Sequence, residues 1–130
     1  RLDVNALTTY VNQRGDPQQL LHRYVHALGT QIAQSGVCNR FHNIDERLAR
    51  WLLMTHDRIG SDQLRATQES IAQMLGVRRS SVTAAARGFQ KQQIIDYRRG
   101  RIEILDQGKL RAACCGCYAL MKRQYDSFLN

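Results

Sequence analysis

The stretch TQESIAQMLGVRRSSVTAAAR, residues 67–87, decides the fold that we expect for this chain. Thr67 suits the N-cap of a first helix, in which Ile71, Met74 and Leu75 recur at helical spacing. Gly76 then permits the left-handed backbone conformation in which such a helix ends. A second apolar stripe follows at Val82, Ala85, Ala86 and Phe89. The stretch therefore predicts two helices joined by a tight turn, a helix-turn-helix.

The polar side chains of the second helix are expected on the face that turns away from the first helix. If Val77 and Val82 pack inward, the outward positions are Arg79, Ser80, Thr83 and Arg87. An arginine at a helix start can form two hydrogen bonds with guanine, and serines can donate to phosphates. The pattern favours a recognition helix in a DNA major groove. An ordinary helical hairpin with a solvated basic face is the alternative.

A β-hairpin is predicted after this helix. Residues 94–98 and 101–105 alternate apolar and polar side chains around the turn Arg99-Gly100. Such a hairpin is the wing of a winged helix. Arg98, Arg99 and Arg101 at its tip would contact the sugar-phosphate backbone without reading bases. A merely solvated charged turn is the alternative.

Positive charge is concentrated in the second half of the chain. The 130 residues carry a net charge of +8, of which residues 78–130 contribute +7 and residues 1–77 only +1. Concentrated charge beside a groove-reading helix indicates a nucleic-acid partner. An acidic protein would also be attracted, so a winged helix used for protein docking, with a basic face, is a second hypothesis.

The overall composition is that of a folded protein outside the membrane. A hydrophobic content of 43% excludes wholesale disorder. The sequence contains no apolar run of about 20 residues and no signal-peptide pattern at its start. We expect a cytoplasmic, nucleoid-associated protein that has no membrane partner.

A long helix is predicted from Pro17 to about Asn39. Leu21, Val25, Leu28 and Ile32 step by four, three and four residues, which is the spacing of a heptad seam. We interpret these four side chains as a homodimer interface, because two recognition helices related by a two-fold axis read half-sites about 34 Å apart. A helix buried within its own chain is the alternative.

The other predicted elements are short. A helix ends near Arg14, and another begins at Asn43 or Asp45 and carries Trp51 toward the core. Residues 63–66 alternate like a short strand. Asp106 is expected to cap a helix that reaches about Cys117, and residues 118–129 are expected to add another turn or two.

Four cysteines raise the question of a metal or redox site. Cys38, Cys114, Cys115 and Cys117 are badly spaced for a disulfide framework, so we expect reduced thiols that serve as packing residues. A thiol or metal sensor through the Cys114-Cys117 cluster is the alternative. His22 and His26 lie four residues apart but lack a third ligand of suitable spacing. We predict no metal site, no catalytic residues and no enzyme activity.

The order of these elements resembles the C-terminal part of bacterial Crp/Fnr-type transcription regulators. The likeness rests on CNRFHNIDERLARWLL, residues 38–53, and on TQESIAQMLGVRRSSVT, residues 67–83. It implies a mainly α fold with a small β wing. It implies a winged helix-turn-helix domain at residues 43–130, a dimerisation helix at 17–40, and the end of a cyclic-nucleotide-binding-like sensor domain at 1–16. The sequence begins with Arg1 rather than Met, so we expect a longer protein.

The resemblance also implies a function. Proteins of this type bind a palindromic operator in double-stranded DNA as homodimers and contact RNA polymerase, here through the loop at residues 57–62. An effector, for example a cyclic nucleotide, would bind the missing N-terminal sensor domain, so we expect no cofactor in this fragment. Iron-sulfur cysteines in the family lie in that sensor part, which does not match Cys114, Cys115 and Cys117.

Individual roles can be carried over by position. Arg79 matches a base-contacting arginine, but Ser80 stands where the family often has glutamate, and Ala84 replaces a later base-reading arginine. The best-known operator sequence of the family is therefore not expected. We expect base contacts from Arg79, Ser80 and Thr83. We expect phosphate contacts from Thr67, Gln68, Arg78, Ser81, Arg87, Arg98, Arg99 and Arg101.

Overall fold

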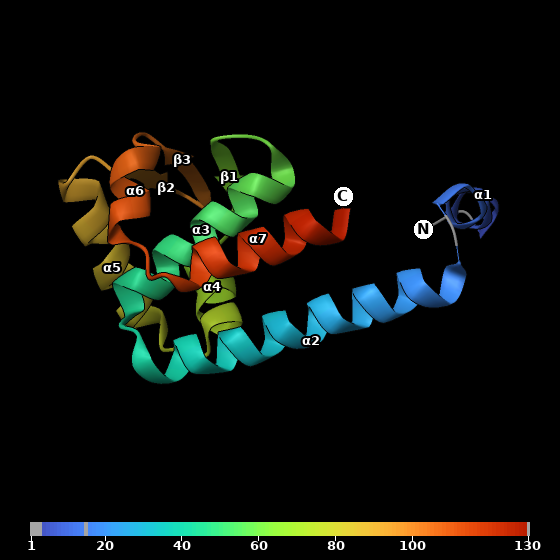
Figure 1. Ribbon diagram of the computed structural model, residues 1–130. Coiled ribbons are helices and arrows are strands. Elements are labelled where there is room, and N and C mark those ends of the chain that lie inside the picture. The colour runs from blue at the N-terminus through green and yellow to red at the C-terminus, as the bar shows by residue number, and fades with distance from the viewer. Residues whose placement is uncertain (1–3, 15, 130) are drawn as a thin grey trace.

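The computed structural model describes residues 4–14 and 16–129 (Figure 1). Its elements run in the order α1 (Val4–Arg14), α2 (Pro17–Phe41), α3 (Ile44–Ile59), β1 (Gln63–Arg65), α4 (Gln68–Leu75), α5 (Arg79–Lys91), β2 (Ile95–Arg98), β3 (Arg101–Ile104), α6 (Gln107–Ala113) and α7 (Cys117–Leu129). The predicted fold class, mainly α with a small β wing after a long helix, is confirmed.

The core lies between the helices α3, α4 and α5 and one face of a small antiparallel sheet. The strand order is β1-β3-β2, and Leu64 pairs with Ile102, which in turn pairs with Tyr97. Alternation along β3 turns Ile102 and Ile104 toward the helices while Arg101 and Glu103 stay exposed. The fully buried helix residues include Leu48, Leu52, Leu53, Ile71 and Val82.

Local sequence signals fix where the helices begin and end. Asn43 caps α3 through a capping box: its side chain accepts from the Glu46 amide at 2.9 Å, and the Glu46 carboxylate accepts from the Asn43 amide at 3.0 Å. Thr67 and Asp106 cap α4 and α6 in the predicted way. Gly76 ends α4 with φ of 64°, a conformation that glycine adopts without strain.

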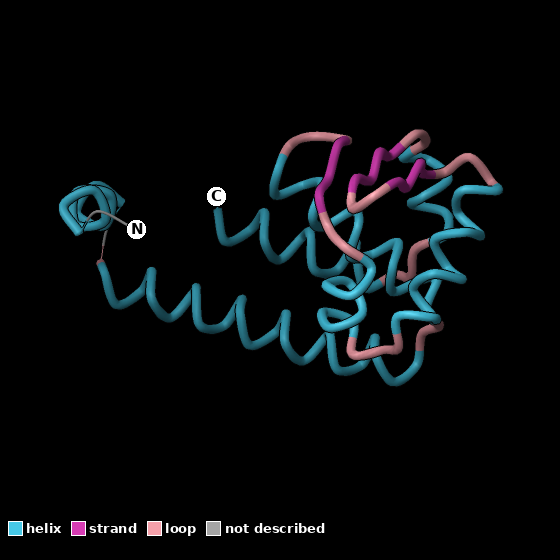
Figure 2. The backbone as a smooth tube through the Cα atoms, turned by 180° about the vertical axis from the view of Figure 1, so that it is seen from behind, coloured by secondary structure: helices cyan, strands magenta, loops and turns pink. Residues whose placement is uncertain are grey.

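The long helix α2 extends well beyond the winged-helix core (Figures 1 and 2). Its C-terminal half packs against α7, whereas its predicted heptad side chains stay open to solvent in the single chain. The exposed fractions are 59% for Leu21, 57% for Val25, 42% for Leu28 and 64% for Ile32. These four residues thus form an apolar stripe, the α2 seam, that the described part of the chain does not cover.

The C-terminal region differs from the prediction. We expected one helix from Gln107 to about Cys117, but α6 ends at Ala113 and α7 begins at Cys117. Cys114 has an extended backbone, with φ of −84° and ψ of 149°, which interrupts the helix. The interruption turns Cys115 and Cys117 toward Cys38, and their burial outweighs the weak local preference for a continuous helix. Along the described residues, no helix has the length and apolar character needed to cross a bilayer.

Asp57 on α3 forms hydrogen bonds with two residues of α7. Its Oδ2 accepts a hydrogen bond from the Tyr118 hydroxyl at 2.7 Å and one from the Lys122 ammonium at 3.2 Å, while His56 Nδ1 lies 3.5 Å from Oδ1. Burial alone would raise the pKa of Asp57, but the hydrogen bonds from Tyr118 and Lys122 outweigh it and lower that pKa. Ionised Asp57 is therefore stabilised by the fold.

We expect Asp57→Asn to remove an acid-sensitive part of the stability. The folded pKa lies below the unfolded value of about 3.9, so the contribution is present above that value and is lost as pH falls through the folded pKa. The Tm of the wild-type chain should therefore drop more steeply than that of the variant below about pH 4. Asp126→Asn, at an exposed position on α7, should follow the wild type. Parallel Tm curves for wild type and Asp57→Asn would contradict the assignment.

Candidate nucleic-acid interface

The turn between α4 and α5 presents the start of α5 to solvent. Val82 is fully buried and Val77 is half-buried, so these two side chains attach the first turn of α5 to the core. Arg78, Arg79 and Ser80 are all exposed at this end of the helix. The structure therefore places two guanidinium groups and a hydroxyl at one helix start, as the sequence predicts.

The amino end of α5 lacks the side-chain cap that the neighbouring helices have. Asn43, Thr67 and Asp106 cap α3, α4 and α6, but Arg78, at the N-cap of α5, makes no capping hydrogen bond. The first amides of an uncapped helix can donate to an anion, and the helix dipole favours negative charge there. This end of α5 is thus suited to a phosphate oxygen or a base edge.

Thr83 is less available than predicted. Its side chain is half-buried, and its hydroxyl donates to Gln68 Oε1 and lies 3.1 Å from the carbonyl oxygen of Arg79. Gln68 is also half-buried, because it bridges α4 and α5 through this contact. Ala84 is exposed instead, on the outward face of the helix. Of the three residues predicted to contact bases, Arg79 and Ser80 are exposed to a partner. Thr83 instead holds α5 to α4 through its hydrogen bond to Gln68.

The wing is a two-residue hairpin in which both turn residues have positive φ. Arg99 has φ of 49° and Gly100 φ of 74°, a combination that matches the right-handed twist of the flanking strands. Arg98 and Arg101 pair across the turn, and Arg98, Arg99 and Arg101 are all exposed. Arg98 Nε forms a solvent-exposed ion pair with Asp96 at 3.3 Å.

Tyr97 fixes the wing against the helix-turn-helix. Its hydroxyl donates to the Ala66 carbonyl at 2.7 Å, just before α4, and its carbonyl accepts from Gln90 Nε2 at 3.1 Å on α5. Burial raises the pKa of Tyr97, and the nearby charge of Arg79 opposes that rise. Arg79 is therefore near enough to β2 for its charge to act on Tyr97.

The other predicted phosphate contacts lie around the same elements. Thr67 and Arg87 are exposed and Ser81 is half-buried. The basic surface, defined here as Arg78, Arg79, Arg87, Arg98, Arg99 and Arg101, comes from α5, its N-cap and the wing. No acidic side chain other than Asp96 is recorded in an ion pair with this surface among the described residues. The surface can therefore bind a polyanion.

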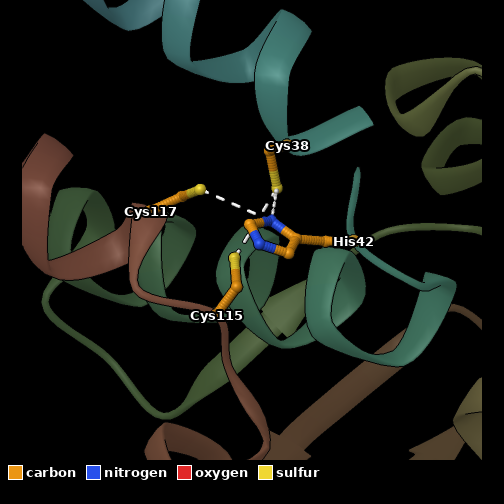
Figure 3. Close-up of side chains that lie close together, drawn as sticks. All are labelled: Cys38, His42, Cys115 and Cys117. Atoms are coloured by element: carbon orange, nitrogen blue, oxygen red, sulfur yellow. Dashed lines mark hydrogen bonds between the residues drawn. The ribbon is translucent and has the colours of Figure 1, made fainter. Parts of the chain in front are cut away.

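A second group of chemically active side chains lies elsewhere in the fold. The structure brings together Cys38, His42, Cys115 and Cys117, whose ligand atoms all lie within 4.8 Å of one another (Figure 3). The sequence pattern singles out the cysteines but not His42. The signals were present as Cys38-x-x-x-His42 and Cys115-x-Cys117, but the two pairs are 73 residues apart, from position 42 to position 115. Only packing of α7 on α2 joins them.

Burial favours the protonated form of two thiols in this region. It raises the pKa of Cys38 to about 12 and that of Cys114 also to about 12, although the charge of Arg50 opposes both shifts. A buried, protonated thiol is a poor nucleophile. Cys38 is thus unsuited to act as the nucleophile of covalent catalysis. His22 and His26 are exposed on α2, away from these cysteines in sequence.

The chain is similar in sequence to a known family of DNA-binding domains. A protein-family model described as the Crp-like helix-turn-helix domain matches residues 46–113. The comparison with curated proteins gave no match.

Two solved structures have similar folds. One, described as a transcriptional regulator of the crp/fnr family from Eubacterium rectale, is 26% identical, with a TM-score of 0.64 over 79% of this chain and 48% of that one. The other, a CRP-family transcriptional regulator from Thermus thermophilus, is 21% identical and shows the fold, with a TM-score of 0.61 over 78% of this chain and 56% of that one. This chain spans about half the length of both.

Proposed function

The chain belongs to the family defined by the Crp-like helix-turn-helix domain, and we propose that it is a homodimeric, sequence-specific DNA-binding transcription regulator. The observation that carries the proposal is the exposed, uncapped start of α5 with Arg79 and Ser80 on it. In this arrangement α5 enters the major groove with its first turn toward the base edges. Arg79 reads guanine through two hydrogen bonds, and Ser80 and the methyl group of Thr83 contact neighbouring bases.

The remaining basic side chains position the protein on the duplex. Arg99 and Arg101 of the wing contact the phosphates beside the groove, as do Arg78 and Arg87 near α5. Further phosphate contacts come from Thr67, Gln68, Ser81 and Arg98. These contacts supply affinity and register but no base preference.

The α2 seam is the surface through which two copies of the chain would pair to form the DNA-binding dimer. An apolar stripe of Leu21, Val25, Leu28 and Ile32 that is exposed in one chain becomes buried when two copies of α2 pair. The paired helices then set the distance between two copies of α5, which suits a palindromic operator with half-sites about 34 Å apart. A sensor domain that ends with residues 1–16 and binds an effector, for example a cyclic nucleotide, can alter this geometry.

Two further parts of the proposal concern the cell. The segment at residues 57–62, which was expected to be a loop, comprises the last turn of α3 and the loop after it, and it offers a polar surface for RNA polymerase. A protein with these partners works in the cytoplasm, at the nucleoid. It needs no catalytic chemistry of its own.

The direct test is selection of bound sites from a random duplex pool, followed by a titration at two salt concentrations. We expect enriched palindromes and a dissociation constant for random duplex of about 10⁻⁴ to 10⁻⁶ M that weakens steeply with salt. An acidic-protein partner for the basic surface requires neither result. Failure to enrich any sequence, together with salt-independent binding, would overturn the proposal.

Arg99→Ala should weaken binding to all duplexes alike. The wing arginine contributes one phosphate contact, so the variant should lower the slope of log affinity against log salt by about one, on selected and random DNA equally. Fluorescence anisotropy over a salt series measures this slope. Arg123→Ala removes the same charge from α7 and should leave the slope unchanged. A loss confined to the selected site would show that Arg99 reads bases instead.

A further inference from the structure

Four side chains that can bind metal converge where the end of α2 meets the start of α7. Cys38 lies in the last turn of α2 and His42 directly after it, while Cys115 lies between α6 and α7 and Cys117 is the first residue of α7. In Figure 3 the imidazole of His42 lies among the three sulfur atoms. His42 Nδ1 is 3.4 Å from Cys38 Sγ and 3.5 Å from Cys117 Sγ, and Cys38 Sγ is 3.6 Å from Cys115 Sγ.

These three of the six distances between ligand atoms match the edges of a tetrahedron around one zinc ion, and the other three are at most 4.8 Å. With Zn–S bonds of about 2.3 Å and Zn–N bonds of about 2.05 Å, tetrahedral angles put two sulfurs about 3.8 Å apart and a sulfur and a nitrogen about 3.5 Å apart. The contacts of 3.4 to 3.6 Å fall close to these values. In a 4Fe–4S cluster each thiolate binds a different iron, and in a 2Fe–2S cluster the thiolates are shared between two irons, so sulfurs on different irons stand farther apart. The group therefore has the size of a single-ion site.

We propose that Cys38, His42, Cys115 and Cys117 form a Cys₃His site for one Zn²⁺ ion per chain. On binding, the three thiols release three protons to solvent, and the sulfurs and His42 Nδ1 each donate an electron pair to the ion without any change of oxidation state. Four protein ligands leave no position open for a substrate. The site is structural rather than catalytic.

Arg50 provides the charge that such a site needs. Three thiolates and one divalent ion leave a net charge of about −1 in a buried place. Arg50 is only 7% exposed, and its positive charge acts on both Cys38 and Cys114. Its recorded partners are neutral, Ser35 Oγ and Met121 Sδ, both at 3.4 Å, and its Nε has no partner. Among the described residues, no carboxylate forms an ion pair with Arg50.

Arg47, the other buried arginine of α3, has a partner that compensates its charge. Arg47 is buried to a similar degree one turn earlier on α3, and its Nε also has no partner, but its terminal nitrogen donates to the Leu75 carbonyl at the negative C-terminal end of α4. A buried guanidinium without such compensation is costly. The zinc-thiolate group supplies the missing negative charge beside Arg50.

An amide donor also faces the site. Gln34 Nε2, from α2, lies 3.0 Å from Cys117 Sγ. Donors of this kind stabilise the charge of metal-bound thiolates and hold them in place. With Cys38 fully buried and Cys115 and Cys117 nearly so, the ion would be shielded from solvent on the cysteine side.

The site joins the helix that carries the α2 seam to the C-terminal part of the winged helix. Zinc would thereby fix the angle at which α5 is held relative to α2. This consequence rests on the proposed function, because it matters only if two copies of α5 must meet one duplex. The zinc site itself does not depend on DNA binding.

Elemental analysis tests the site directly. The chain is produced with added zinc, purified under reducing conditions without chelator, and analysed for metal and acid-labile sulfide. We expect about one zinc per chain in the wild type and at least a tenfold loss of zinc affinity in Cys115→Ser. Cys114→Ser is the matched control, because this neighbouring cysteine is not among the four ligands and should keep its zinc.

A second variant separates ligation from folding. His42→Cys offers a fourth thiolate and should keep one metal ion, and Co²⁺ bound to it should show a different visible absorption spectrum from Co²⁺ bound to the wild type. No stoichiometric metal in the wild type, iron with sulfide, or equal zinc loss in Cys114→Ser and Cys115→Ser would overturn the proposal. So would identical cobalt spectra for the wild type and His42→Cys.

A DNA arm tests the consequence separately. Removal of zinc by a chelator should weaken binding to a selected palindrome at least tenfold and leave binding to random duplex nearly unchanged. Unchanged palindrome binding by the zinc-free chain would reject the coupling to α5 but not the zinc site. Absence of any selected sequence would instead reject the proposed function.

Discussion

Lysine introduced into the α2 seam is expected to abolish tight binding to a palindromic site. The double variant Leu28→Lys/Ile32→Lys places two charges at side chains that are 42% and 64% exposed in one chain but face their twin in the proposed dimer. Because repulsion between the charges prevents pairing, each chain would hold only one half-site. We expect a monomer in sedimentation experiments and a loss of about 10²- to 10³-fold in affinity for the selected site.

Ala33→Lys is the control for this prediction. It adds a lysine at an exposed position of α2 that is outside the seam, and we expect it to leave the dimer and its operator affinity intact. Random-duplex affinity should rise slightly for both proteins, because each carries additional positive charge. A double variant that stays dimeric, or binds the palindrome as tightly as Ala33→Lys, would contradict the role of the seam.

Arg79→Ala is expected to give the second large effect. The side chain stands at the exposed, uncapped start of α5, where it can form two hydrogen bonds with a guanine edge. Losing such a pair costs about 1 to 3 kcal/mol per half-site, so a dimer on a palindrome should lose about 2 to 6 kcal/mol, or about 30- to 10⁴-fold. Titration against the selected site and against single-base variants of it measures both the loss and the relaxed preference.

Arg79→Lys tests whether geometry or charge carries the effect. Lysine keeps the charge but cannot offer the planar pair of donors, so we expect most of the discrimination to be lost while random-duplex binding stays near that of the wild type. If Arg79→Ala weakened selected and random duplexes to the same degree, Arg79 would be a phosphate contact and not a base reader.

The helix boundaries show how far local signals reach. Asn43, Thr67, Gly76 and Asp106 act on backbone groups within four residues of themselves, so their roles as caps and as a helix stop are visible in the sequence. The wing is equally local, because Arg99-Gly100 and the alternating strands on either side are contiguous. For these elements the tertiary structure confirms what neighbouring residues already favour.

Two features that differ from the sequence-based prediction, the end of α6 and the orientation of Thr83, depend on packing between elements that are distant in the sequence. The helix predicted to reach Cys117 stops at Ala113, because Cys115 and Cys117 are buried against α2. Thr83 was expected to face outward, yet it is half-buried through its contact with Gln68 on the neighbouring helix. In both cases a contact with another element outweighs the helical pattern.

The sequence by itself determined the helix-turn-helix, the wing, the α2 seam and the placement of positive charge, since each depends on the order and spacing of nearby residues. Only the tertiary structure decided that Cys38 and His42 meet Cys115 and Cys117, and that Arg50 is buried beside them. Spacing within a helix cannot reveal which distant segment packs against it, because that choice is made by the burial of whole faces. The proposed zinc site therefore depends on how α7 packs on α2.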